Sequence, residues 1–321
     1  MKYSQIAQMV FNQPHAILPE KLSDIAGLVE LRERGQSMSE AEIKAIVPKS
    51  EELTPYCLSE AGERIEVEAM ASKSHGGGLI AVMPLFGSIF QHAGMMQMIS
   101  GGTSTERFGN QFQDLLHSPD VSTIIIKGNT PGGSVFGVEE LSAQIHAGRK
   151  SGKRIVAVAD SVIASAGTWI ATAAHEVVVT TGGEIGSIGV ISMYADRSQQ
   201  ESEAGVARTI VRTPQNKARF TGVEPMDDDM MKTMVGRNEE AYDRFVRAVA
   251  RNRGVSLSKV KDDFGGGEML TAKEAVTVGL ADRVATFRDV IAEERERIAG
   301  GRKRSAQRRA NENRLRLAEL A

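Results

Sequence analysis

Short runs of β-branched and other apolar residues recur along the middle of the chain and constrain its fold more than any other feature. They lie at 79–83, 121–126, 155–159 and 177–179. Runs of this length without polar alternation are typical of strands buried on both faces. Amphipathic stretches separate them, so we expect parallel strands joined by helical crossovers, an α/β domain over about 79–290.

Apolar residues at helical spacing predict helices in the intervals. The expected helices contain the stripes Phe108–Leu116 and Val138–Ile145, and they cover Asp227–Arg251 and Thr271–Val278. The glycine pair Gly300-Gly301 is expected to end the helical pattern before a charged tail.

The first 78 residues are expected to form a helical extension and a joint. Ser39 begins a capping-box pattern for a helix over 39–47, which Pro48 would end. The Gly and Ser residues of 71–78 cannot bury much surface and predict a flexible joint. The expected organisation is an N-terminal extension at 1–78, the α/β domain at 79–290, and a charged helical or disordered tail at 291–321.

Composition excludes several classes of protein. Of the 321 residues, 41% are apolar and 25% are charged, as in ordinary globular proteins. No run approaches the ~20 apolar residues that cross a bilayer, and the N-terminus lacks the apolar core of a signal peptide. The single cysteine, Cys57, excludes an intrachain disulfide and a cysteine-rich metal site. We therefore expect a protein that is neither secreted, nor membrane-spanning, nor built on a disulfide scaffold.

The net charge of −2 conceals an asymmetry between body and tail. Residues 300–321 hold seven basic and two acidic side chains, a charge of +5, which leaves −7 for the rest of the chain. A basic tail suits contact with nucleic acid or with an acidic partner; the alternative is the solvated end of a helix.

Two Gly- and Ala-rich turns hold residues whose chemistry goes beyond packing. Asn129-Thr-Pro-Gly-Gly-Ser134 separates an expected strand from an expected helix, so its glycines give either a tight turn or free N–H groups for an anion. Ser165, in Ala-Ser-Ala-Gly, is expected at a helix start, where the N–H of Ala166 is placed to stabilise an oxyanion. Small residues there equally permit close helix packing.

A serine nucleophile requires a base. His175 is expected on the helix that follows Ser165, with its ring turned elsewhere, and the other histidines are interpreted as surface or capping residues. The remaining candidate is Lys217, which follows an expected strand at 209–211. A lysine accepts a proton only if desolvation lowers its pKa from about 10.4, and most lysines lie at the surface.

In this order the motifs resemble those of the serine–lysine peptidases of the signal peptide peptidase A (SppA) family. The similar segments are Asn-Thr-Pro-Gly-Gly at 129–133, Ala-Ser-Ala-Gly at 164–167, Gly-Ser-Ile-Gly-Val at 186–190, the segment ending at Lys217, and a closing helix and strand at 270–282. The resemblance covers about 79–290 and implies a Clp protease/crotonase-type fold.

The resemblance also implies roles for individual residues. Ser165 matches the nucleophile, Lys217 the general base, and Ser187 the hydroxyl that orients the lysine amine. Gly133 and Ala166 match the positions whose N–H groups form the oxyanion hole. In such a dyad a neutral lysine takes the serine proton during attack on a peptide carbonyl and passes it to the leaving amine. No metal or cofactor is implied.

Four residues depart from the family's pattern. Ala166 stands where glycine is usual, and Thr168, Arg219 and Phe220 also differ, so substrate preference is not carried over.

The family has a membrane-bound branch and a soluble branch encoded in tailed phages and prophages. Met9-Val-Phe-Asn-Gln-Pro14 resembles the lead-in of the phage enzymes, which process scaffold, portal or other head proteins during capsid maturation. The resemblance therefore implies protein substrates, a homo-oligomer, and a place in the host cytoplasm or inside the procapsid, where the basic tail would hold the enzyme.

Three alternatives remain open. A Clp-type Ser-His-Asp peptidase on the same fold would need a histidine within 182–194, which contains none. A crotonase-type acyl-CoA enzyme needs no serine at position 165. The chain could also be a non-enzymatic scaffold or assembly protein with a vestigial dyad.

Overall fold

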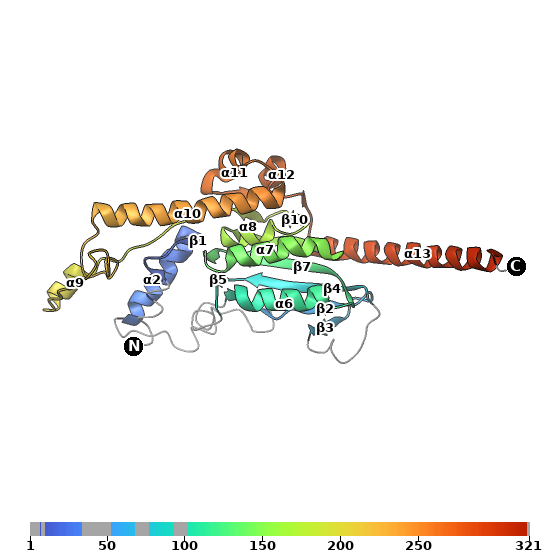
Figure 1. Cartoon of the computed structure of the whole chain (residues 1–321), viewed down its shortest axis with the longest axis horizontal. Helices are drawn as coiled ribbons and strands as arrows, with labels where there is room; N and C mark the ends of the chain where they lie inside the picture. The colour runs from blue at the N-terminus through green and yellow to red at the C-terminus, as the bar shows by residue number, and fades with distance from the viewer. Residues whose placement is uncertain (1–6, 8–9, 34–52, 68–76, 93–101, 320–321) are drawn as a thin grey trace.

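The computed structural model describes residues 7, 10–33, 53–67, 77–92 and 102–319 (Figure 1). The expected helix over 39–47 and most of the expected joint at 71–78 lie outside the described residues.

A nine-stranded sheet forms the centre of the described part of the chain. Its strands are β2 (Tyr56–Leu58), β3 (Arg64–Glu66), β4 (Leu79–Phe86), β7 (Val121–Thr130), β9 (Arg154–Ala164), β10 (Glu176–Val179), β11 (Glu184–Gly186), β12 (Met269–Thr271) and β13 (Arg283–Val284). The main order is β12-β11-β9-β7-β4-β2-β3, with β10 pairing β9 and β13. All four apolar runs are strands here, and β4, β7 and β9 pair in parallel, which confirms the α/β class.

Helices pack on both faces of this sheet (Figure 1). One face carries α6 (Thr105–His117), α7 (Val138–Gly148), α8 (Ala166–Ala171) and α10 (Asp228–Arg253), and the other carries the start of α13 (Phe287–Glu319). Successive strand residues alternate between the faces. Ile124 belongs to the core under α6 and α7, whereas Ile125 packs with Val290 of α13. This burial on both sides explains the continuous apolar runs.

A four-stranded sheet lies at the carboxyl ends of the central strands. It consists, in order, of β1 (His15–Ile17), β8 (Gly132–Ser134), β5 (Ser88–Phe90) and β6 (Gly102–Ser104). β1 runs antiparallel to β8, whereas β5 is parallel to both β8 and β6. Because β5 follows β4 and β8 follows β7 after a single residue, this sheet begins where two central strands end.

The N-terminal region is not only helical. α2 (Pro19–Glu33) agrees with the expectation, but β1 joins the small sheet and β2 extends the central one, with Cys57 opposite Ala81. Three-residue strands carry little periodic signal in a sequence, which is why these were missed.

Two further expectations are wrong. Gly300-Gly301 does not end a helix, since α13 continues to Glu319 and projects from the body (Figure 1). A glycine costs an exposed helix only about 1 kcal/mol relative to alanine, and the charged residues around this pair are good helix formers. The expected strand at 209–211 is irregular chain, with Val211 94% exposed.

The remaining helices are α9 (Ser198–Glu203), α11 (Leu257–Asp263), α12 (Ala272–Val278) and the 3-10 turns η2 (Arg149–Ser151) and η3 (Gly265–Gly267). Among the described residues, no helix has the length and apolar character needed to span a membrane.

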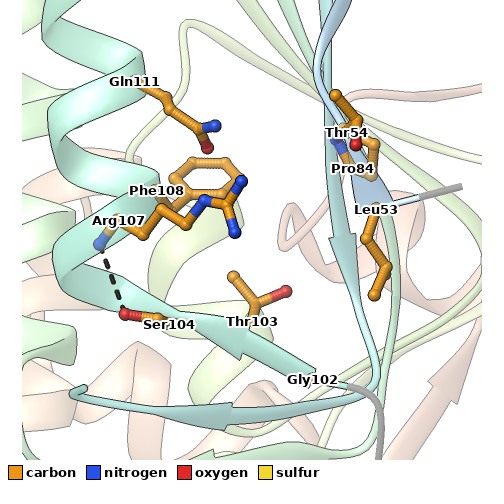
Figure 2. A pocket seen from close by; sticks show the side chains of 9 residues that line it. All are labelled: Leu53, Thr54, Pro84, Gly102, Thr103, Ser104, Arg107, Phe108 and Gln111. Atoms are coloured by element: carbon orange, nitrogen blue, oxygen red, sulfur yellow. Dashed lines mark hydrogen bonds between the residues drawn. The ribbon is translucent and has the colours of Figure 1, made fainter. Parts of the chain in front are cut away.

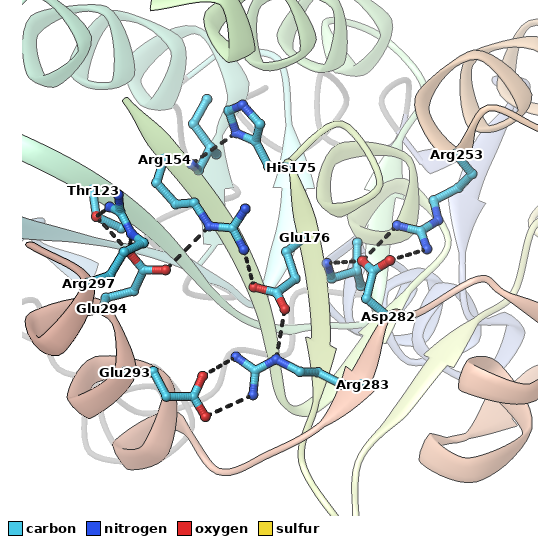
Figure 3. Close-up of polar contacts among 12 residues, drawn as sticks. Thr123, Arg154, His175, Glu176, Arg253, Asp282, Arg283, Glu293, Glu294 and Arg297 are labelled. Carbon is cyan, nitrogen blue, oxygen red and sulfur yellow. Dashed lines mark hydrogen bonds and ion pairs between the residues drawn. The ribbon is translucent and has the colours of Figure 1, made fainter. Parts of the chain in front are cut away.

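Ion pairs attach the first half of α13 to the sheet (Figure 3). The carboxylate of Glu294, whose side chain is 7% exposed, accepts hydrogen bonds from Thr123 of β7 at 2.9 Å and Arg154 of β9 at 3.3 Å. Arg297 donates to the same carboxylate at 2.7 Å. Since a buried carboxylate is costly unless it is paired, these partners fix where α13 lies on the sheet.

Candidate active site

Ser165 lies at the junction between β9 and α8. Its backbone has φ 55° and ψ −113°, a conformation that residues other than glycine rarely adopt. Its N–H donates to the carbonyl of Gly186 at 2.8 Å, and its carbonyl accepts from the N–H of Trp169 at 3.0 Å. The tight turn from strand to helix is therefore fixed on both sides of the serine.

The side chain of Ser165 is fully buried, and its hydroxyl makes a long contact of 3.4 Å with the carbonyl oxygen of Gly189. The next residue, Ala166, opens α8. The first N–H groups of a helix have no acceptor within the helix, which is the situation an oxyanion donor requires.

The structure brings the turn Gly132-Gly133 to this serine. A Cβ atom on Gly132 would lie 3.0 Å from the Cβ of Ser165 and 2.3 Å from the carbonyl oxygen of Ala16. A Cβ on Gly133 would lie 2.0 Å from the carbonyl oxygen of Ile89. Only glycine permits these approaches, so both glycines are needed for β8 to pass between β1, β5 and the serine.

Ser187 follows β11 as Ser165 follows β9. The two strands are parallel, with Gly186 opposite Ala164, so the two serines leave the sheet at the same edge. Ser187 is 6% exposed, and its N–H donates to the carbonyl of Glu268 at 2.8 Å. The two serines therefore follow paired residues of adjacent strands.

Two of the predicted site residues, Ser165 and Ser187, have strained backbone conformations. Five described residues other than glycine have positive φ: Asn12, Ser161, Ser165, Ser187 and Ala218. Two are the predicted serines, and Ala218 follows the predicted base. Such conformations persist only where the surroundings enforce them, and they concentrate at functional sites.

Lys217 is not brought to Ser165. It lies in an exposed turn, where its N–H donates to the carbonyl of Pro214 at 3.0 Å. The segment between α9 and α10, drawn in yellow, extends past the N-terminal end of α10 (Figure 1). α8 lies instead under the C-terminal half of that helix, where Trp169 stacks on Phe245 with ring centroids 4.6 Å apart.

The residues that follow Lys217 are anchored to other parts of the chain. The side-chain amide of Asn12 donates to the carbonyl of Phe220 at 2.9 Å. Arg219 pairs with Asp227 at 3.3 Å and with Asp229 at 2.7 Å, at the N-terminus of α10. In the sequence, Arg219 and Phe220 are only departures from the pattern of the SppA family. Their anchoring role depends on contacts that form in the folded chain.

Two histidines have defined places. His175 accepts a hydrogen bond from the N–H of Ile155 at Nδ1 and donates from Nε2 to the carbonyl of Arg149, and burial lowers its pKa. His15 is not the surface or capping residue that was expected: it is buried in β1 and donates to the carbonyl of Val10 at 3.0 Å. No histidine hydrogen-bonds to Ser165 within the described ranges.

Two pockets lie beside these elements. One of about 130 Å³ adjoins α6, with Arg107, Phe108 and Gln111 on one side and Leu53, Thr54 and Pro84 opposite (Figure 2). It contains none of the predicted site residues. Another of about 400 Å³ is lined by methionines of α10 together with Ser192 and Tyr194, a few residues beyond Gly189. Neither contains a nucleophile paired with a base.

Residues 147–299 match the family model described as Peptidase family S49. Over these residues the chain is similar to peptidase family S49. The matched residues include Ser165, Ser187 and Lys217, whereas Gly133 precedes them. This match and the protease relatives support a serine-type endopeptidase, in agreement with the resemblance to SppA.

Several curated proteins similar to this chain are proteases of phage and cellular origin. Capsid assembly protease C of Escherichia phage lambda is 27% identical over 310 residues, which cover 92% of this chain and 68% of the relative. Protease 4 of Salmonella typhi is 29% identical over 68% of this chain, and the matched part spans only 35% of that protein. A putative signal peptide peptidase SppA of Enterococcus faecium is 24% identical over 58% of this chain and 54% of its own length.

Among solved structures, the chain is similar to a point mutant of ClpP1 from Listeria monocytogenes. The two chains are 18% identical, with a TM-score of 0.40, and the match covers 65% of this chain and 92% of the other.

Proposed function

We propose that this chain cleaves peptide bonds in proteins of capsid assembly, with Ser165 as its nucleophile. The observation that carries the proposal is the strained, buried serine at a strand-to-helix turn, packed against Gly132. The hydroxyl attacks a peptide carbonyl, and the N–H groups of Gly133 and Ala166 stabilise the resulting oxyanion. One such donor is typically worth about 10²–10³ in rate.

In this proposal Lys217 is the general base and Ser187 orients its amine. Lys217 is exposed on the segment between α9 and α10, so in this proposal it reaches Ser165 by a rearrangement of that segment or from a second copy of the chain. Either route takes the amine out of water, which favours its neutral form. The second route accounts for the expected homo-oligomer.

The substrate assignment follows the phage relative, whose name is capsid assembly protease C. We extend that role to this chain as proteolysis of scaffold, portal or other head proteins, in the host cytoplasm or inside the procapsid. Lys303, Arg304 and Arg308 are exposed on the second half of α13, and we propose that they contact an acidic protein or nucleic acid. The division of the chain at about 78 and 290 belongs to the same proposal.

The decisive experiment is co-expression with neighbouring head proteins, comparing the native chain with Ser165→Ala and Lys217→Ala. Both variants should lose processing, while Lys232→Ala, another exposed lysine, should retain it. Full processing by Lys217→Ala would refute the lysine base. If a fluorophosphonate labels Ser165 neither in the folded native protein nor in folded variants whose site is opened, the chain is an assembly protein with a vestigial dyad.

Mixing the two inactive variants distinguishes the routes for the lysine. Restored cleavage in a mixture of Ser165→Ala and Lys217→Ala means that the serine of one copy uses the lysine of another. A mixture that stays inactive, while each variant retains the native oligomeric state, assigns both residues to one chain.

A further inference from the structure

Strand β1 is held between two segments that flank Ser165. On one side His15 pairs with Ser134 and Ala16 with Gly133 of β8. On the other side the N–H of His15 donates to the carbonyl of Ile191 at 2.8 Å, and the N–H of Ile191 donates back at 2.9 Å.

The same pairing continues at both ends of β1. The N–H of Asn12 donates to the carbonyl of Met193 at 2.9 Å, and the N–H of Leu18 donates to the carbonyl of Pro131 at 2.9 Å. Residues 12–18, which we call the strap, therefore fill a slot whose walls are β8 and the segment 189–193.

The slot places a peptide bond of the strap beside the nucleophile. The carbonyl oxygen of Ala16 and the Cβ of Ser165 border the same small space, since a Cβ on Gly132 would meet both, at 2.3 Å and 3.0 Å. The carbonyl of Gly189, which accepts the hydroxyl contact of Ser165, belongs to the opposite wall. A peptide carbonyl thus lies where a peptidase would present its substrate.

Extended peptides bind to proteins by adding a strand to an unpaired sheet edge, where backbone hydrogen bonds give affinity and side-chain pockets give selectivity. We propose that the slot between β8 and 189–193 is the peptide-binding site of the enzyme, and that the strap occupies it as an internal pseudo-substrate. This inference rests on the proposed function of Ser165.

Side-chain burial along the strap defines the class of peptide that fits. Ala16 is fully buried, so its position accepts only a small side chain. Ile17 is 4% exposed and packs in one apolar cluster with Phe90, residues of α2 and Phe11, which directly precedes the strap. The slot therefore selects an extended segment with a small residue beside the serine and an apolar residue directly after it.

The strap also holds the segment that carries the predicted base. Asn12 donates its side-chain amide to the carbonyl of Phe220, three residues beyond Lys217. Departure of the strap would therefore open the slot and free the lysine segment in one step, and substrate access would be coupled to the movement that the dyad requires.

The test compares rates at which a fluorophosphonate labels Ser165 in the full chain. Ile17→Ala removes an apolar anchor of the strap, so labelling should accelerate by about tenfold or more. Ile298→Ala is the matched control. Ile298 is also buried, but it lies on α13 and packs on the face of the central sheet that α13 covers. It should label at the native rate.

A synthetic peptide of residues 10–21 supplies the second measurement. Added to the Ile17→Ala protein, it should slow labelling toward the native rate, whereas a scrambled peptide should not. If Ile17→Ala does not fold, Asn12→Gly replaces it, because glycine adopts the φ of 66° at that position and removes only the bond to Phe220.

The outcomes separate this inference from the proposed function. Equal labelling of native and strap variants, abolished by Ser165→Ala, leaves the nucleophile in place and overturns the pseudo-substrate. Absence of labelling in all folded variants refutes the nucleophile itself. Faster labelling of the strap variant, reversed by the peptide and not by its scrambled form, supports the strap as the occupant of the slot.

Discussion

Protonation of His15 should destabilise the protein as the pH falls. The ring lies in the middle of the strap, and burial lowers its pKa from 6.5 to about 4, against a smaller opposing effect of its bond to Val10. The folded state therefore binds this proton more weakly than the unfolded state does. The free energy of unfolding is therefore unaffected by this group above pH 6.5, and it decreases as the pH falls from 6.5 toward 4. For these two pKa values, the free energy of unfolding decreases by about 2 kcal/mol at about pH 5 and by about 3 kcal/mol at the acid limit.

The measurement is urea unfolding of the native protein and of His15→Gln, at about pH 7.5 and about pH 5. Glutamine places an N–H near the position of Nε2, so the bond to Val10 is retained in a side chain that does not titrate. On going from the higher to the lower pH, the free energy of unfolding of the native protein should therefore fall by about 2 kcal/mol more than that of the variant. Parallel pH dependence of the two proteins would refute a buried, neutral His15.

Two smaller changes test local features. Thr271 caps α12 in a capping box with Glu274, so Thr271→Ala should lower the free energy of unfolding by about 1 kcal/mol, and Thr271→Ser should recover most of it. Gly300 and Gly301 have no neighbours that a Cβ would meet, so replacing both by alanine should stabilise α13 by about 1 kcal/mol per site. Circular dichroism should show increased helicity; an unchanged spectrum contradicts a continuous helix.

Local signals predicted several elements closely. α10 begins after Asp227, whose side chain caps it, and ends at Gly254, whose φ of 67° suits a left-handed cap. Both signals involve residues within one turn of the helix end, so a sequence contains them in full. The helix start at Ser165 was likewise predicted from the small residues around it, whereas Ser187 was identified only through the resemblance to SppA.

Expectations that depended on distant partners were less successful. Residues 209–211 pair with none of the described strands and are irregular chain in the structure. The reverse holds for β1, whose three residues have little β propensity. They form a strand because they pair with β8 on one side and with Ile191 on the other. Strand pairing is non-local, so neither result could be read from a short window.

The sequence by itself determined the α/β class, the main helices and the serine that lies at a strand-to-helix turn, because periodicity, caps and turn residues act over a few positions. Only the tertiary structure decided where Lys217 lies and what fills the slot beside Ser165. Those placements depend on backbone hydrogen bonds and apolar contacts between residues far apart in the chain, such as His15 with Ile191 and Asn12 with Phe220. Such contacts form only when the whole fold brings their partners together.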